Sequence, residues 1–157
     1  MGECVVTGVA GKKGITAITL EKSLMNGEVG FVEKVLDVIG KRGISFEHLP
    51  SGIDTLSLVI DSEYLKNGIL EEILQELRER LQPDRLYTHE NMALVATVGH
   101  GMARNVGTSA RLFKTLSEAG INVNMIDQGS SEMNIIVGVE DQDYANCIRA
   151  IYTEFFE

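Results

Sequence analysis

The segment GINVNMIDQGSSEMNIIVGV, residues 120–139, interrupts an apolar run with uncharged hydrogen-bonding side chains. These side chains are the amides and hydroxyls of Asn122, Asn124, Gln128, Ser130, Ser131 and Asn134. Such groups bind backbone atoms or a zwitterion without adding net charge, but no nucleophile or general base stands beside them. The segment therefore indicates packing or ligand contact rather than catalysis.

The histidines and cysteines offer no clearer reactive or metal site. His48, His89 and His100 lie far apart in sequence and have no neighbours at metal-ligand spacing. Cys4 and Cys147 show neither CxxC nor Cys/His spacing. We expect both cysteines to be buried free thiols in a reducing cytoplasm, and we expect no metal ion.

Composition and charge exclude several classes of partner. The chain has 157 residues, of which 44% are hydrophobic and 24% charged, as in a globular protein. Its net charge is −9, without a basic stripe, which argues against nucleic acid. No apolar run approaches the roughly 18 residues of a membrane helix, and the start is not a signal peptide. We therefore expect a cytoplasmic protein.

The chain repeats itself at a spacing of 77 residues. Residues 29–60 and 106–137 align without a gap, so that Gly30 falls on Gly107 and Gly43 on Gly120. Apolar positions match as well, for example Val35 with Leu112. A shared register of glycines and apolar residues over this length indicates an internal duplication.

Each copy predicts the same series of elements. Strands are expected at 15–20 and 92–98, and each is followed by a helix whose apolar residues recur at the spacing of one helical face. In the first copy these apolar residues are Val32, Val35, Leu36 and Ile39. Residues 44–49 alternate as a strand does, and the turns at Gly52 and Gly129 precede return strands at 55–61 and 132–139. A second helix follows each hairpin, and 85–90 is a further strand.

The strand count predicts how the two copies are connected. The second copy ends on its helix, whereas CVVTGVA, residues 4–10, is a spare strand at the other end of the chain. The economical solution returns this strand to the second unit, which also protects a sheet edge. We expect an α+β protein of two ferredoxin-like βαββαβ domains, with residues 14–90 inserted between residues 1–13 and 91–157.

The chain resembles a known family in three stretches. VTGVA, VGHGMARNVG and GINVNMIDQGSSEMNI are similar to the C-terminal regulatory region of aspartate kinases, and the resemblance covers essentially the whole chain. That region consists of two ACT domains, the first inserted in the second. The resemblance implies an allosteric module that binds an end-product amino acid, lysine or threonine, mediates feedback inhibition and forms a homodimer.

The catalytic activity of the family belongs to another domain. Aspartate kinases use ATP and magnesium to phosphorylate the side chain of aspartate in an N-terminal kinase domain. This chain shows no GxxxxGK[ST] motif and no set of residues suited to phosphate and magnesium. We expect no catalytic residue and no cofactor in this chain, and the kinase domain or subunit as its partner. The sequence fits a separate regulatory subunit and an excised domain equally.

The ligand site is expected where a strand leads into the first helix. An α-carboxylate binds well to N–H groups at a helix N-terminus, and Gly30 lets a ligand approach the backbone closely. By resemblance to lysine-inhibited members, Met25 lines this pocket, the next strand closes it, and Glu47 and Asp54 are candidates to bind a lysine ammonium. The nine expected positions are Met25, Glu28, Gly30, Phe31, Val32, Ser45, Phe46, Glu47 and Asp54.

Each of these positions has a structural alternative. Gly30 could simply start a helix, Phe31 could belong to the core, and Glu47 and Asp54 could be surface acids. Asn122, Gln128 and Ser131 are the candidates for a second ligand site, with domain packing as the alternative. A module that holds kinase subunits together without binding a ligand is the competing function.

Overall fold

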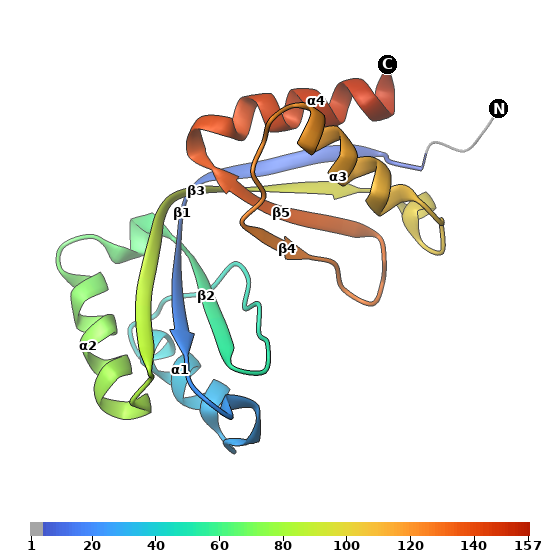
Figure 1. Cartoon of the computed structure of the whole chain (residues 1–157). Coiled ribbons are helices and arrows are strands. Elements are labelled where there is room, and N and C mark those ends of the chain that lie inside the picture. The colour runs from blue at the N-terminus through green and yellow to red at the C-terminus, as the bar shows by residue number, and fades with distance from the viewer. Residues whose placement is uncertain (1–4) are drawn as a thin grey trace. The chain divides into compact units, whose positions relative to one another are not determined.

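The computed structural model describes residues 5–157, which form five strands and four α-helices (Figure 1). The strands are β1 (Gly8–Glu21), β2 (Thr55–Asp61), β3 (Arg85–Val98), β4 (Met125–Asp127) and β5 (Asn134–Glu140). The helices are α1 (Phe31–Gly40), α2 (Ile69–Leu81), α3 (Thr108–Glu118) and α4 (Tyr144–Phe156). The hydrogen-bonding order of the strands is β2-β1-β3-β5-β4, and the registers between β1 and β2, β3 and β5, and β4 and β5 are antiparallel. The predicted α+β class is confirmed.

The chain divides into two compact units, one made of Met1–Lys13 with Asn91–Glu157 and the other of Gly14–Glu90. Strands β1 and β3 contribute residues to both units. Each strand has a left-handed residue at the division, Gly14 with φ 71° and Asn91 with φ 57°. We describe each unit by itself.

In the unit Gly14–Glu90, helices α1 and α2 pack on a sheet formed by β2, the second half of β1 and the first half of β3 (Figure 1). The register of β1 with β2 runs from Ile15 opposite Asp61 to Glu21 opposite Thr55. Burial follows the strand and helix periods, since alternate strand residues and one face of each helix meet in a single core. This core includes Ile18, Leu20, Val35, Leu58 and Ile73.

The strand predicted at residues 44–49 does not form as a continuous strand, and this prediction was wrong. Only the isolated bridges from His48 to Val59 and from Ser51 to Leu56 are present. The amides of Glu47 and His48 both donate to the Val59 carbonyl, at 2.7 and 3.5 Å. Two residues facing one disrupt a ladder as a bulge does, and Pro50 has no N–H to continue it.

In the other unit, which includes residues 91–157, helices α3 and α4 pack on the second half of β3, on β5 and on the N-terminal segment of the chain. Strand β5 pairs with β3 from Met92–Glu140 to Val98–Asn134 and carries β4 on its other side. The Thr7 amide donates to the Val98 carbonyl at 2.7 Å, and the Val6 side chain is fully buried in this core. The N-terminal segment is thus part of the packing of this unit.

Of the two cysteines that we expected to be buried free thiols, the structure describes one. Cys147 is a buried free thiol on α4, and burial, with a smaller effect of Asp143, raises its pKa to about 11. Such a thiol is unreactive at neutral pH. Cys4 lies outside the described residues. Among residues 5–157, no helix is long and apolar enough to cross a membrane.

Candidate functional site

Helix α1 begins at a glycine whose backbone leaves the helix N-terminus open. Gly30 has φ 78°, a left-handed conformation that glycine adopts without the steric cost of a Cβ atom. No side chain caps this end, and the Phe31 amide makes only a 3.4 Å contact with the Glu28 carbonyl. The first-turn N–H groups of a helix have no partner within the helix, so this end can receive an anion.

The loop before α1 is tied to the turn of the neighbouring hairpin. The Lys22 amide donates to the Asp54 carbonyl at 2.9 Å, and the Asn26 amide donates to the Ile53 carbonyl at 3.1 Å. A short 3-10 helix, Met25–Gly27, contains Asn26 and precedes Gly30. The position of the helix N-terminus is therefore set by backbone bonds to the hairpin.

The expected site residues differ in exposure. Met25 and Phe31 are 4% and 2% exposed and lie in the core, so in this unit Phe31 offers its backbone N–H rather than its ring. Val32 and Phe46 are about two-fifths exposed, at 41% and 43%. Ser45 is exposed as well. The Phe31 side chain is thus a core residue, as the structural alternative for this position proposed.

Glu28 is already paired with two cations. Its carboxylate lies 2.8 Å from Lys22 Nζ and 3.8 Å from Lys34 Nζ. The hydrogen bond from Lys22 is the main reason that the pKa of Glu28 lies below its ordinary value, against a smaller opposing effect of burial. Because Lys22 also donates to the Leu81 carbonyl, Glu28 belongs to an ion-pair cluster at the end of α2.

Glu47 and Asp54 lie at different levels of the hairpin. The Glu47 amide bonds to Val59, whereas Asp54 immediately precedes Thr55, the first residue of β2. Five residue steps along the strand separate Asp54 from Val59, which corresponds to about 17 Å at ~3.4 Å per residue. The two carboxylates are therefore alternatives for one ammonium group within a chain, since an ion pair requires separations of about 4 Å.

A pocket of about 720 Å³ lies beside Gly30, along α1. Val29, Gly30, Glu33, Lys34, Asp37 and Arg80 line it. Arg80 comes from α2 and lies 2.6 Å from Asp37. No pattern in the sequence indicates Arg80, because only the packing of α1 against α2 brings it to this pocket.

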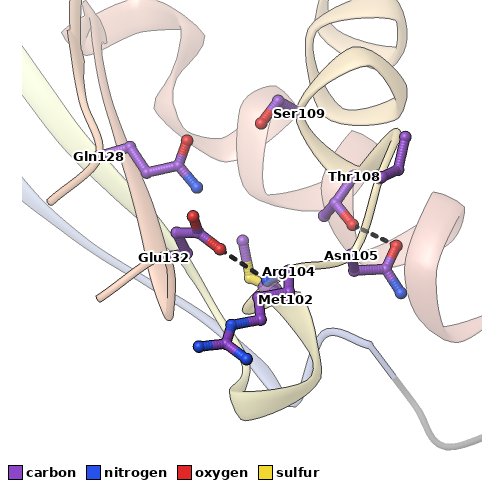
Figure 2. Close-up of a pocket in the computed structure, with 8 residues that line it drawn as sticks. Met102, Arg104, Asn105, Thr108, Ser109, Gln128 and Glu132 are labelled. Carbon is purple, nitrogen blue, oxygen red and sulfur yellow. Dashed lines mark hydrogen bonds between the residues drawn. The ribbon is translucent and has the colours of Figure 1, made fainter. Parts of the chain in front are cut away.

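A second pocket, of about 280 Å³, lies at the corresponding end of α3 (Figure 2). Figure 2 shows Gln128 and Glu132 on one side and Thr108 and Ser109 of α3 on the other. The further lining residues are Met102, Arg104, Asn105 and Val106. Helix α3 also begins after a left-handed glycine, Gly107, with φ 95°.

Of the three residues expected at a second site, the structure brings only Gln128 to this pocket, while Asn122 and Ser131 are exposed residues outside its lining. The other lining residues were missed, although the 77-residue repeat was a usable signal. It places Met102 on Met25, Asn105 on Glu28 and Ser109 on Val32.

Comparison with known proteins gives the following relatives. Residues 95–155 match the model of the ACT domain family. Aspartokinase 3 of Bacillus subtilis (strain 168) is 36% identical over 151 residues, which are 96% of this chain and 33% of that protein. The chain thus spans about one third of the length of the curated aspartokinases that it matches.

Two solved structures agree with this relationship. Aspartate kinase of Clostridium acetobutylicum, described as an allosteric enzyme, is 49% identical with a TM-score of 0.92, over 96% of this chain and 34% of that one. A C-terminal regulatory domain of aspartate kinase from Porphyromonas gingivalis W83 is 25% identical with a TM-score of 0.75, over 99% and 100% of the two chains. Residues 95–155 of the chain therefore match an ACT domain, and nearly the whole chain is similar to a part of aspartokinases that includes a C-terminal regulatory domain.

Proposed function

We propose that this chain senses a free amino acid for an aspartate kinase and transmits feedback inhibition to a kinase domain or subunit. The observation that carries the proposal is the open N-terminus of α1, where Gly30 replaces a side-chain cap. The amides of Gly30, Phe31 and Val32 would bind the α-carboxylate, since unpaired donors and the helix dipole coincide there. Homology to aspartokinases over nearly the whole chain supports this assignment.

Lysine is the effector we propose, with threonine as the alternative. A partly desolvated ammonium requires a carboxylate, and Glu47 on the segment beside β2 is our assignment for this role. Met25, Ser45 and Phe46 would complete the surroundings of the ligand. Glu28 is a weaker choice because Lys22 and Lys34 already neutralise it.

The two compact units would be two ACT domains, the first inserted into the second. The division of the chain at Lys13–Gly14 and Glu90–Asn91 supports this arrangement. Domains of 70–80 residues bury a small core, which favours a homodimer. Feedback inhibition then requires lysine to bind one arrangement of the dimer better than another, since equal affinity shifts no equilibrium.

A second ligand position is proposed in the pocket at α3. Its polar lining combines Gln128, Asn105 and Ser109 with one acid, Glu132, and one base, Arg104. This balance suits a small zwitterion with an uncharged side chain, such as threonine, better than lysine. Asn122 and Ser131 would then act in packing.

Calorimetric titration of the chain with each of the twenty amino acids tests the proposal. Lysine should give saturable heat, and Glu47→Gln should weaken its binding about tenfold because a charge-assisted hydrogen bond is lost. Glu63→Gln, which changes an exposed acid that pairs with Lys66 in the same unit, is the matched control. A chain that binds neither lysine nor threonine would refute amino-acid sensing and favour the competing role in subunit assembly.

A further inference from the structure

Two loops that lead to helix N-termini contain residues in an unfavourable backbone conformation. Leu24 has φ 59° and Arg104 has φ 58°. Residues with a Cβ atom adopt this left-handed conformation at a cost of roughly 1–2 kcal/mol, and neither leucine nor arginine has the short side chain that eases it. Leu24 is also 78% exposed, so burial of its side chain does not compensate.

In both loops a carboxylate holds the N–H of the left-handed residue. The Leu24 amide donates to Asp54 Oδ1 at 3.0 Å, and the Arg104 amide donates to Glu132 Oε2 at 2.6 Å (Figure 2). Asp54 and Glu132 both lie in the turn of a hairpin, just before β2 and β5 respectively. Each acid therefore joins a hairpin turn to the loop that enters a helix.

The two contacts are built from different positions of the repeat. In the 77-residue register Leu24 falls on Gly101 and Asp54 falls on Ser131, whereas Arg104 falls on Gly27 and Glu132 on Thr55. The same contact is thus made twice by residues that do not correspond. This recurrence ties the contact to the loop and turn that it joins, rather than to the register that the two copies share.

We infer that Asp54 and Glu132 are positioning residues, each of which holds the loop before α1 or α3 in the conformation that presents the helix N-terminus. The inference rests on the proposed function and changes one role within it. Asp54 acts on the ligand through the backbone of Leu24, and Glu47 remains the acid that contacts the ammonium. Outliers of this kind persist where the surrounding structure holds them in place, often at ligand sites.

The loop before α1 has a second carboxylate contact, which limits the expected effect. The Ser23 amide donates to Asp84 Oδ2 at 2.8 Å. Loss of the Asp54 carboxylate alone therefore leaves the loop held by Asp84 and by the backbone bonds of Lys22 and Asn26. Because apparent affinity falls with the fraction of binding-competent protein, we expect a change of about fivefold to tenfold rather than a complete loss of binding.

The test compares Asp54→Ala with Asp54→Asn in the full chain, using lysine and threonine as separate titrants and hydrogen exchange of residues 22–27. Asparagine keeps an oxygen that can accept from the Leu24 amide, whereas alanine does not. We expect Asp54→Ala to speed exchange in this loop and to weaken whichever amino acid binds by about fivefold to tenfold. Asp54→Asn should restore both properties nearly to those of the wild type. Glu71→Ala, at an exposed acid on α2, is the control.

A double variant separates positioning from general damage. Glycine adopts the left-handed conformation freely, so Leu24→Gly combined with Asp54→Ala should recover part of the lost affinity. Unchanged loop exchange in Asp54→Ala would overturn the inference. So would a loss in Asp54→Asn confined to lysine, which would make Asp54 a direct ammonium partner. A wild-type chain that binds neither amino acid would refute the proposed function, while loop exchange would still decide the role of Asp54.

Discussion

Replacement of Gly99 by alanine should displace the N-terminal segment from the unit that contains residues 91–157. A Cβ atom at Gly99 would lie 2.1 Å from the Val5 carbonyl oxygen and 2.9 Å from the Val6 Cα. Both contacts are with backbone atoms, which cannot rotate away as a side chain can. Gly99 has an extended φ of 179°, so the effect is steric and not one of backbone strain.

The magnitude follows from what this displacement would remove. The fully buried Val6 side chain would become exposed, at about 1.5–3 kcal/mol for a side chain of this size. The bond from the Thr7 amide to the Val98 carbonyl would be lost, at about 1 kcal/mol net. Small shifts of the backbone around the new methyl group would reduce the sum of these two losses. We therefore expect the free energy of unfolding of this unit to fall by about 2–4 kcal/mol.

Urea denaturation followed by circular dichroism gives the free energy, and hydrogen exchange gives its location. Exchange should rise in β3 and β5 at residues 92–98 and 134–140, and remain unchanged in β2. Gly8→Ala is the matched control, because a Cβ atom there meets nothing within 4 Å. If Gly99→Ala were as stable as Gly8→Ala, the packing of the N-terminal segment in this unit would be refuted.

Four further predictions follow from the same structure. Thr97→Val should raise the free energy of unfolding by about 1 kcal/mol, because the buried Thr97 Oγ1 has no hydrogen-bond partner among residues 5–157; lower stability in urea would contradict this. Burial alone would raise the pKa of Glu76, but hydrogen bonds from Lys41 and Arg42 outweigh it and hold the pKa below the ordinary 4.5. The stability that ionised Glu76 contributes is therefore complete above pH 4.5 and is lost as the pH falls through its folded pKa. Glu76→Gln should lower the free energy of unfolding by roughly 1–2 kcal/mol at pH 7 and by less at pH 3. An equal loss at both pH values would contradict this role of Glu76. Glu47→Gln should weaken lysine about tenfold and leave any threonine binding unchanged, and an equal effect on both would move the ammonium site elsewhere. Sedimentation at micromolar concentration should show a dimer, and a monomer with and without lysine would exclude the proposed assembly.

The positions of the strands and helices could be predicted from the sequence more accurately than the buried faces of the helices. The sequence was sufficient to predict β2 at 55–61 and the glycines that precede α1 and α3. The period of a strand and the left-handed conformation of a glycine are both local properties of the chain. The inward face of α1 was less accurate. Val32 was expected on it, yet Val32 is exposed while Val38 is fully buried. The angular position of this helix depends on its packing against α2, which a periodic pattern does not specify.

The candidate sites show the same limit. The open N-terminus of α1 could be predicted from Gly30, and the repeat could have indicated the pocket at α3. The contact between Arg104 and Glu132 could not be predicted, because 28 residues separate them and both are left-handed without being glycine. Such conformations are set by tertiary contacts rather than by local preference.

The most direct test of amino-acid sensing is the response of individual amides to lysine. In a nitrogen-15-labelled chain, stoichiometric lysine should shift the amide resonances of Gly30, Phe31 and Val32 most strongly, because their N–H groups would bind its carboxylate. The amides of Thr108 and Ser109, at the equivalent end of α3, should change little at the same concentration. Shifts confined to Thr108 and Ser109, or no shift at either helix, would contradict the binding of lysine at the N-terminus of α1.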